Sequence, residues 1–354
     1  MNCYKKSKVL VIGHTGFKGS WLVNCLNFFQ AQVYGISKEK INKSINYEAS
    51  KIKKKLIKEY NIDVRNYKDL DKAITEIKPK FIFYLAAQSL VGRSYKDPYE
   101  TWNINFNGAL NLLEILKKKN FKTNLILITS DKCYKNIEKK TGYKEDNYLG
   151  GLDPYSASKS SVEILYKSYY DSYFARKSNL KSATARAGNV IGGGDLSENR
   201  IVPDCIKSWQ KKTVAKIRNP NSTRPWQHVL EPLNGYLILA EKLYRNPKKY
   251  SGPWNFGTKK NTITNVLKVV EKIVKFWGRG KIKFKKTQKY YEQVNLQLNI
   301  EKSMKILHWS PKYNITKSIN VTTDWYKKVL NKENNPEEIT KKQIKEYMNE
   351  FNKN

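Results

Sequence analysis

Short apolar runs alternate with longer amphipathic stretches through the first half of the chain. The runs are rich in β-branched residues, which indicates strands, and the stretches between them place apolar residues at helical spacing. The predicted strands are Lys8–Ile12, Gln32–Ile36, Lys80–Leu85, Asn124–Thr129 and Ser182–Arg186. The predicted helices are Gly16–Phe29, Tyr67–Ile77, Tyr99–Lys119 and Tyr155–Ala175. Strands that alternate with helices predict an α/β fold with a doubly wound parallel sheet.

The pattern changes after Arg186, where a Gly-rich loop, short amphipathic pieces and a Pro-punctuated segment follow. We expect a large sheet lobe from residues 1–186, with a returning segment at about 226–257. We expect a smaller, mixed α/β lobe and C-terminal helices from residues 187–225 and 258–354. The smaller lobe would close over the carboxyl ends of the strands, where open α/β sheets bind ligands.

The tail beyond Lys332 is charged but not featureless. Its apolar residues Ile339, Ile344, Tyr347 and Met348 are spaced for one face of a short helix. The sequence therefore predicts a C-terminal helix that docks on the protein surface.

The chain is strongly basic, with 67 Lys and Arg residues against 31 Asp and Glu and a formal net charge of +36. Clustered Lys and Arg are typical of nucleic-acid binding, because they neutralise phosphates and release counterions. Here nearly all the basic residues are Lys, spread from end to end, while Arg is scarce. We interpret the charge as compositional bias rather than a nucleic-acid interface, although it provides an attractive field for an anionic substrate.

The length of the apolar stretches and the spacing of the cysteines indicate the cellular compartment of the protein. No apolar stretch reaches the length of a signal-peptide core or a membrane span. The cysteines, Cys3, Cys25, Cys133 and Cys205, lack the close pairing of a zinc site or a disulfide scaffold. The sequence therefore predicts a soluble cytoplasmic protein with no metal and no membrane partner.

A glycine-rich loop, Gly13-His-Thr-Gly16-Phe-Lys-Gly19, joins the first predicted strand to the first predicted helix. Small residues in this position let the backbone approach a pyrophosphate at the positive helix N-terminus. The G-x-x-G-x-x-G spacing is that of short-chain dehydrogenases rather than of other dinucleotide folds. The loop predicts a Rossmann-type dinucleotide site, with a plain glycine-rich turn as the alternative.

The end of the second predicted strand should distinguish NAD from NADP, because an acidic side chain there commonly bonds the ribose 2′-hydroxyl of NAD. The chain has Ser37 and Lys38 instead. Ser37 could bond a 2′-hydroxyl, whereas Lys38 could pair with a 2′-phosphate. NAD is the first choice, and NADP stays open.

The motif Tyr155-Ser-Ala-Ser-Lys159 stands at the start of a predicted helix. Residues four apart share a helix face, so we expect the Lys159 ammonium near the Tyr155 phenol. A phenol is a poor base at neutral pH, but an adjacent cation and a nearby oxidised nicotinamide favour the phenolate. Tyr–Lys pairs are common on helix surfaces, so the motif gains its weight from the glycine loop that precedes it.

Ser130, Asp131 and Lys132 directly follow the strand that ends at Thr129. Side chains at the carboxyl end of a parallel strand reach into the ligand cleft. We therefore expect a hydroxyl, a carboxyl and an amine in the site.

Five segments together make the sequence specific enough to compare with a family: Asn103–Asn105 with Gly108, Ser130–Tyr134, Gly150–Ser156, Ala185–Asp195 and Arg224–Leu233. On these segments the chain resembles the CDP-glucose 4,6-dehydratases of the extended short-chain dehydrogenase/reductase superfamily. The likeness is dense from about Val9 to Leu243 and thinner beyond.

The resemblance implies a nucleotide-sugar dehydratase with a bound nicotinamide cofactor. The implied cofactor contacts are Gly13, Thr15, Gly16, Phe17, Gly19, Ser37, Asp63, Val64, Leu85, Ala86, Ala87, Asn105, Tyr155 and Lys159. The implied substrate contacts are Gln88, Ser89, Arg93, Ser130, Asn189, Arg200 and Arg224. The implied catalytic residues are Ser130, Asp131, Lys132, Tyr155 and Lys159.

By the same resemblance, Tyr155 takes the proton of the sugar's 4-hydroxyl while hydride leaves carbon 4, and Ser130 bonds the same oxygen. The 4-ketone acidifies carbon 5, so Lys132 removes that proton while Asp131 protonates the departing 6-hydroxyl. Hydride then returns to carbon 6. Related dTDP-glucose and GDP-mannose dehydratases have Glu where this chain has Lys132. A lysine is mostly protonated at neutral pH, so burial or nearby positive charge would have to lower the pKa of Lys132 for it to act as a base.

Two other hypotheses stay open. A nucleotide-sugar epimerase or reductase would share the glycine loop and the Tyr155–Lys159 pair but would not need Asp131 and Lys132 together. A basic RNA-associated protein on a dehydrogenase fold would leave the catalytic set unused. CDP-glucose is the favoured substrate, and family analogy suggests a homodimer through paired long helices that include the one bearing Tyr155.

Several conspicuous side chains are not assigned to the chemistry. His228 stands beside apolar residues, and an imidazole in that setting is more often packed than catalytic. Trp102, Trp209 and Trp226 are expected in the core or in the walls of the nucleotide pocket.

Overall fold

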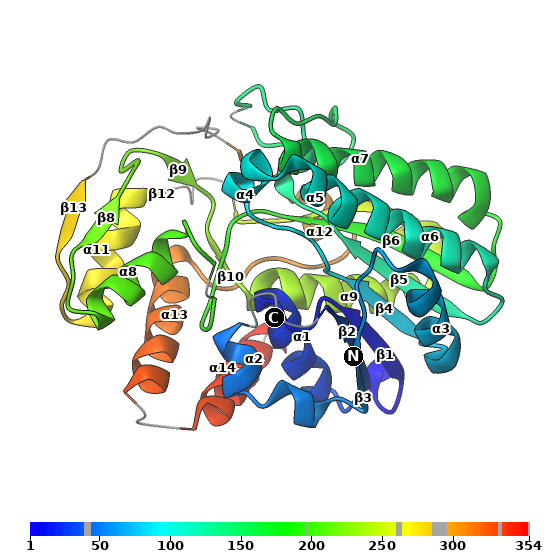
Figure 1. Ribbon diagram of the computed structural model, residues 1–354, viewed down its shortest axis with the longest axis horizontal. Helices are drawn as coiled ribbons and strands as arrows, with labels where there is room; N and C mark the ends of the chain where they lie inside the picture. The colour runs from blue at the N-terminus through cyan, green and yellow to red at the C-terminus, as the bar shows by residue number, and fades with distance from the viewer. Residues whose placement is uncertain are drawn as a thin grey trace.

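A seven-stranded parallel sheet forms the centre of the protein, in the order β11-β6-β5-β4-β1-β2-β3 (Figure 1). The computed structural model describes residues 1–38, 44–139, 141–195, 197–259, 264–284, 296–331 and 335–352. The strands are β1 (Lys8–Ile12), β2 (Gln32–Ser37), β3 (Lys58–Asn61), β4 (Phe81–Tyr84), β5 (Thr123–Ile128), β6 (Leu180–Ala187) and β11 (Gly252–Phe256). The strand order reverses between β1 and β4, which is where doubly wound sheets bind ligands.

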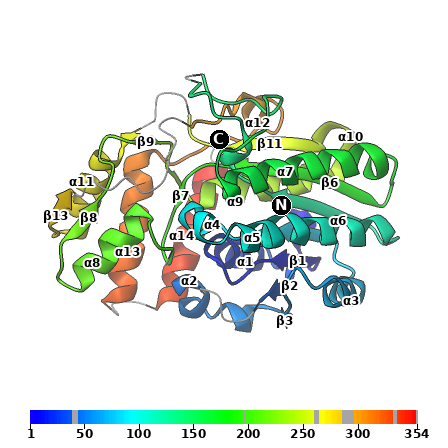
Figure 2. The same ribbon diagram turned by 45° about the horizontal axis from the view of Figure 1, so that its top comes forward.

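Helices cover both faces of this sheet (Figure 2). Successive residues of β1 explain why: Val9 and Val11 pack into one apolar core, and Leu10 and Ile12 into the other. The first core is closed by α1 (Phe17–Phe28) and α9 (Leu230–Arg245), and the second by α3 (Tyr67–Ile77), α6 (Gly108–Lys118) and α7 (Pro154–Tyr169). A strand buried on both sides is the expected state of a parallel sheet.

A second group of elements lies beside the carboxyl ends of the strands, on the left of Figure 1. Its helices are α8 (Ile201–Gln210), α11 (Val266–Trp277) and α13 (Ile315–Leu330). Its short strands pair as β8 (Ala215–Ile217) with β13 (Ile282–Phe284), and β9 (Thr223–Arg224) with β12 (Thr264–Asn265). The strands β7 (Val190–Ile191) and β10 (Gln227–His228) pair where the chain passes between the two groups.

Shorter helices complete the described chain. They are α2 (Ile45–Ala49), α4 (Val91–Lys96), α5 (Pro98–Trp102), α10 (Pro247–Tyr250) and α12 (Glu301–Lys305). Short 3-10 turns occur at Asn2–Tyr4, Ile52–Lys55 and Asp131–Cys133. No helix in these described ranges combines the length and the apolarity that a membrane span needs.

The C-terminal helix α14 (Pro336–Asn352) docks as the tail pattern predicts. Ile339, Ile344, Tyr347 and Met348 are all buried, and α14 packs on α1, α2 and α13. The docking also has a polar anchor, because the Tyr347 hydroxyl donates a hydrogen bond of 2.6 Å to the Glu231 carboxylate of α9.

The predicted α/β class and parallel sheet are confirmed, with two corrections. The sheet has seven strands rather than five, because the edge strand β3 has no apolar pattern and Pro253 argues against a strand at β11. The predicted helix Tyr99–Lys119 is α5 and α6 joined by a π-helical turn at Asn103–Asn107, which inserts an extra residue per turn without breaking the apolar pattern.

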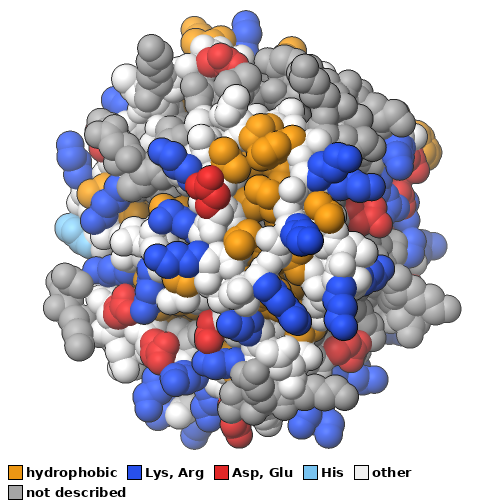
Figure 3. Space-filling view, turned by 90° about the vertical axis from the view of Figure 1, so that its left-hand side faces the viewer, with side chains coloured by type: hydrophobic (Ala, Val, Ile, Leu, Met, Phe, Trp, Pro, Cys, Tyr) orange, Lys and Arg blue, Asp and Glu red, His pale blue; other side chains and the backbone are white. Residues whose placement is uncertain are grey.

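The basic side chains do not gather on the face of the second group that Figure 3 shows. Lysines and arginines are spread around a central apolar strip, with acidic side chains among them. This distribution agrees with the dispersed charge of the sequence.

Candidate active site

The glycine loop between β1 and α1 is a tight turn pressed against the end of β4. Gly13 has a φ of +93°, and a Cβ there would lie 2.7 Å from the backbone nitrogen of Ala86. A Cβ on Gly19 would lie 2.1 Å from the Gly13 carbonyl oxygen. Only glycine fits at either position, and the turn leads directly into the N-terminus of α1, as a pyrophosphate site requires.

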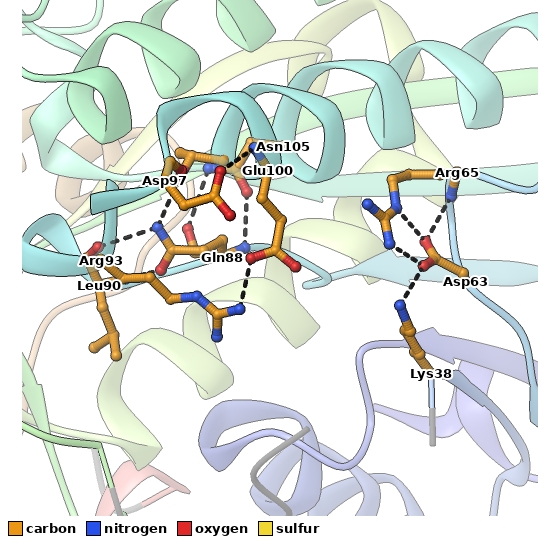
Figure 4. Close-up of polar contacts among 10 residues, drawn as sticks. Lys38, Asp63, Arg65, Gln88, Leu90, Arg93, Asp97, Glu100 and Asn105 are labelled. Carbon is orange, nitrogen blue, oxygen red and sulfur yellow. Dashed lines mark hydrogen bonds and ion pairs between the residues drawn. The ribbon is translucent and has the colours of Figure 1, made fainter. Parts of the chain in front are cut away.

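The end of β2 has an ion cluster that the sequence did not reveal (Figure 4). Lys38 Nζ lies 3.1 Å from Asp63 Oδ2, and Arg65 pairs with the same carboxylate at 2.5 Å. Chiefly through the Arg65 hydrogen bonds, the pKa of Asp63 falls well below its usual range. Ser37 Oγ accepts a weak bond of 3.4 Å from the Thr15 backbone, which ties β2 to the glycine loop.

Asn105 and Gln88 form a buried network rather than a free ligand surface (Figure 4). Asn105 exchanges hydrogen bonds with the Gln88 backbone and donates another to Ser158 Oγ at 2.9 Å. The Gln88 amide bonds Thr101 and both backbone groups of Leu90. Asn105 therefore holds the segment after β4 against α7, and Gln88 ties the same segment to α5. The direct contacts of Asn105 with cofactor and of Gln88 with substrate stay predictions, since the side-chain amides of both residues already bond other parts of the chain.

The catalytic candidates at the end of β5 converge as expected. Ser130 Oγ donates to Asp131 Oδ1 at 2.8 Å, and both residues are buried. The Lys132 backbone N–H donates to Ser130 Oγ at 3.2 Å, and its side chain is half-buried. These bonds form the short 3-10 turn Asp131–Cys133, which keeps the hydroxyl and carboxyl side by side.

Tyr155 meets this group from the first turn of α7, whose N-terminus is capped by Asp153. The Ser130 hydroxyl is near enough to the phenol to lower its pKa. Burial raises the pKa of Tyr155 to about 12, a rise that the Ser130 hydroxyl and Arg200 oppose. Burial is therefore the largest effect on Tyr155 in the protein alone. The expectation that Lys159 and a nearby oxidised nicotinamide favour the phenolate stays a prediction.

Lys159 lies one turn further along α7 and is buried. Burial lowers the pKa of its ammonium to about 8, while the carboxylate of Glu163 acts in the opposite direction. Lys159 is thus close to its titration point near neutral pH.

Lys18 is a site residue that the sequence reading missed. It belongs to the first turn of α1, and burial followed by the charge of Arg200 lowers its pKa to about 8, with Asp131 opposing. Arg200 is the N-cap residue of α8, and its guanidinium lies 3.5 Å from the Asp195 carboxylate. A cation at the positive N-terminus of a helix is unfavourable unless an anion binds nearby. The lysine within the glycine loop is therefore a sequence signal for an anion site.

The structure also reveals a buried ion pair behind the catalytic helix, between Glu163 of α7 and Arg186 of β6. The two side chains are 2% and 3% exposed and 2.8 Å apart. Nothing in the local sequence identifies such a pair, because the partners are far apart along the chain.

The remaining substrate candidates are spread more widely. Arg93 of α4 pairs with Glu100 at 2.5 Å (Figure 4), and Ser89 is exposed. Asn189 follows β6, and its carbonyl accepts from Gln227 at 3.0 Å. Arg224 lies on β9 and donates to the Thr223 carbonyl. Among the predicted substrate residues, Ser130 and Arg200 both lower the pKa of Tyr155.

The unassigned side chains behave mostly as expected. His228 is fully buried, and burial lowers its pKa to about 3, so it is a packed neutral ring. Trp209 and Trp226 are buried, but Trp102 is 37% exposed on α5, so its expected core position is wrong. No cluster of three or more metal-binding side chains occurs in the described part of the chain.

Comparison with known proteins gives a family match and several full-length likenesses. Residues 10–322 match the family model described as GDP-mannose 4,6 dehydratase. A CDP-glucose 4,6-dehydratase of Salmonella typhimurium is 37% identical over 331 residues, which cover 92% of each chain. A CDP-paratose 2-epimerase of Salmonella typhi is 25% identical and is covered over 82% of its length, against 74% of this chain.

Solved structures share the fold at lower identity. The dTDP-glucose 4,6-dehydratase from Bacillus anthracis in complex with NAD superposes with a TM-score of 0.76 at 21% identity, covering 91% of this chain and 97% of the other. The UDP-glucose 4-epimerase of Thermotoga maritima with UDP-glucose gives 0.79 at 21% identity, covering 91% and 99%.

Proposed function

Because the chain belongs to the GDP-mannose 4,6-dehydratase family, we propose that it dehydrates a nucleotide sugar at carbons 4 and 6, with CDP-glucose as the favoured substrate. The observation that carries the proposal is the buried group of Ser130, Asp131 and Tyr155, which places an acid beside a phenol and its hydroxyl partner. Oxidation at carbon 4 needs the phenol. Elimination needs a second proton donor, which an epimerase does not require.

The cofactor proposed for this site is NAD. The glycine turn leads directly into the N-terminus of α1, which fits the pyrophosphate. At the end of β2, Lys38 is already paired with the ionised Asp63, so its charge is neutralised where a 2′-phosphate would need it. When bound, the oxidised nicotinamide supplies the hydride acceptor, and its reduced form returns the hydride.

The chain's own groups account for the proton movements. Tyr155 takes the proton of the 4-hydroxyl, and Ser130 orients the same oxygen by hydrogen bonding. Because burial raises the pKa of Tyr155 to about 12, the phenolate depends on positive charge. Arg200 lowers the pKa of Tyr155 in the structure, and the proposal assigns further positive charge to Lys159 and the bound cofactor. Removal of water then uses Asp131 as the acid and Lys132 as the base for the carbon 5 proton.

The diphosphate of the substrate is assigned to cations that line the cleft. Lys18 lies in the first turn of α1 and Arg200 directly precedes α8, and the charge of Arg200 helps burial to lower the pKa of Lys18. An anion bound near both would stabilise the charged form of Lys18. Asn189 and Arg224 are further proposed contacts. The preference for CDP-glucose rests on the Ser-Asp-Lys run and on the 37% identical relative of that name.

We also propose a cytoplasmic homodimer. The four cysteines are all free. The outer faces of α5 and α7 carry exposed apolar side chains, Tyr99 and Trp102 on the first and Ile164 on the second. Paired helices from two copies would cover these side chains in the manner of a two-fold interface.

The experiment incubates the protein with NAD and, separately, CDP-glucose, dTDP-glucose and GDP-mannose, and measures product mass. We expect loss of one water from CDP-glucose. The Tyr155→Phe variant is the control, since it loses one oxygen and little packing and should keep the fold without the activity. An unchanged mass with a shifted sugar stereochemistry would indicate an epimerase instead.

A further inference from the structure

The buried ion pair between Glu163 and Arg186 adjoins the catalytic residues without touching the cleft. Glu163 follows Lys159 by four residues on α7, so the two side chains lie on one helix face. Its carboxylate accepts hydrogen bonds on both oxygens. Thr129 Oγ1 donates to one, and Thr184 Oγ1 donates to the other at 2.9 Å.

Thr129 directly precedes Ser130, so the first of these bonds reaches the catalytic turn. Through it, Glu163 fixes the end of β5 relative to α7, the helix that bears Tyr155. Through Thr184 and Arg186 it is joined to β6. Three elements therefore meet at the Glu163 carboxylate. They are the end of β5, which leads into Ser130 and Asp131, the helix α7, which bears Tyr155, and the neighbouring strand β6.

Arg186 compensates the negative charge of this buried carboxylate. It donates to Glu163 Oε2 at 2.8 Å, to the Tyr134 hydroxyl at 2.7 Å and to the Glu145 carbonyl at 3.0 Å. A buried pair of this kind is an expensive way to hold a fold, because apolar residues of similar volume would serve as well or better. Its place next to the catalytic pair suggests a role beyond stability.

We propose that Glu163 is a positioning residue, which sets the Ser130–Tyr155 geometry through Thr129 and sustains the positive charge of Lys159. The inference rests on the proposed catalytic roles of these residues. The titratable groups that act on Glu163 are Arg186 from β6, Lys159 and Tyr166 from its own helix, and Cys133 from the turn after β5. Among the groups that act on Lys159, Glu163 is the carboxylate that holds its pKa up.

The two threonines offer a matched test of the geometric part. Thr129→Val and Thr184→Val each remove one hydrogen bond to the same buried carboxylate and should lower the melting temperature alike. We expect Thr129→Val to lower kcat on CDP-glucose by tenfold or more with little change in KM, since small misplacements of reacting groups are costly. Thr184→Val should stay within about twofold of wild type, because its bond lies away from Ser130. Equal kcat values for the two variants would overturn the geometric part.

The electrostatic part is tested without turnover, so it stands apart from any failure of the proposed dehydration. Competitive acetylation of Lys159 as a function of pH, read by peptide mass spectrometry, gives its pKa in the folded protein with NAD absent. We expect a pKa near 8 in the wild type and a lower one in Glu163→Gln. An unchanged pKa of Lys159 in Glu163→Gln would overturn the electrostatic part. If Glu163→Gln does not fold, Glu163→Gln with Arg186→Met removes both buried charges and takes its place in the same measurement.

Discussion

At the residue scale, Tyr155 and Lys159, the proposed catalytic pair, respond to burial in opposite ways. Burial raises the pKa of Tyr155 to about 12 and lowers that of Lys159 to about 8, because it disfavours the charged form of each. The phenolate is therefore accessible only while neighbouring positive charge is present. In the proposed mechanism, the protonation state of Lys159 therefore affects the first chemical step, in which Tyr155 takes a proton from the substrate.

The activity should accordingly fall on the alkaline side. Lys159 is charged below its pKa and neutral above it, and only the charged form favours the phenolate. We expect kcat/KM to decline above about pH 8, as measured across a pH series in buffers of constant ionic strength. Activity that keeps rising to pH 10 would mean that Lys159 does not support the phenolate.

Lys132 gives a second residue-level prediction, because its proposed role begins only after carbon 4 is oxidised. Lys132→Ala should still bind substrate and form reduced cofactor in a single turnover, with elimination slowed by roughly a hundredfold or more, as for a lost general base. Absorbance at the reduced-nicotinamide band would follow this. Exchange of solvent deuterium into carbon 5 at the wild-type rate would transfer the role to Asp131 or a bound water.

At the element scale, the docking of α14 depends on one buried carboxylate. Glu231 accepts bonds from the backbone of Lys312 and Tyr313 and from the Tyr347 hydroxyl, while burial raises its pKa to about 7. The folded protein binds this proton more tightly than the unfolded chain does. The stability that the group contributes therefore falls as pH rises from about 4.5 through about 7.

Tyr347→Phe should loosen α14 without disturbing the sheet. Loss of one buried hydrogen bond to a carboxyl is expected to cost about 1 to 2 kcal/mol. Hydrogen exchange at pH 7 should accelerate in α14, while β1 stays protected. The idea would have to be abandoned if α14 exchanged at the wild-type rate in this variant.

The elements also show what sequence reasoning can reach. The bounds of β1 were predicted to the residue, since an apolar run followed by a glycine turn is a local signal. The edge strand β3 was missed because Lys-Glu-Tyr-Asn has no apolar pattern, and β11 because Pro253 argues against a strand except at an edge.

The same limit applies within the site. Ser130, Asp131 and Tyr155 were predicted from local motifs, and the structure brings them together. The Glu163–Arg186 pair and the Lys38–Asp63 cluster were not predicted, because each joins residues from separate elements. Gln88 and Arg93 were assigned to substrate by resemblance, yet their polar groups bond other parts of the chain.

At the scale of the whole molecule, the proposed dimer can be tested on the exposed face of α7. Ile164 is 58% exposed there, and a buried Glu at a two-fold interface would place two like charges together. Ile164→Glu should therefore give a monomer by sedimentation equilibrium. Ile57→Glu is the matched control, because Ile57 is equally exposed, at 61%, but lies beside β3 on the far edge of the sheet. A monomeric wild type, or two variants that behave alike, would contradict the interface.

The account as a whole rests on one hydride that leaves carbon 4 and returns to carbon 6 of the same sugar. The most direct measurement incubates the protein and NAD with CDP-glucose that carries deuterium at carbon 4, and locates the label in the product by NMR. We predict a 4-keto-6-deoxy sugar with deuterium at carbon 6 and no net change in the amount of reduced cofactor. Deuterium that is lost to solvent, retained at carbon 4, or accumulated in reduced cofactor would contradict the account.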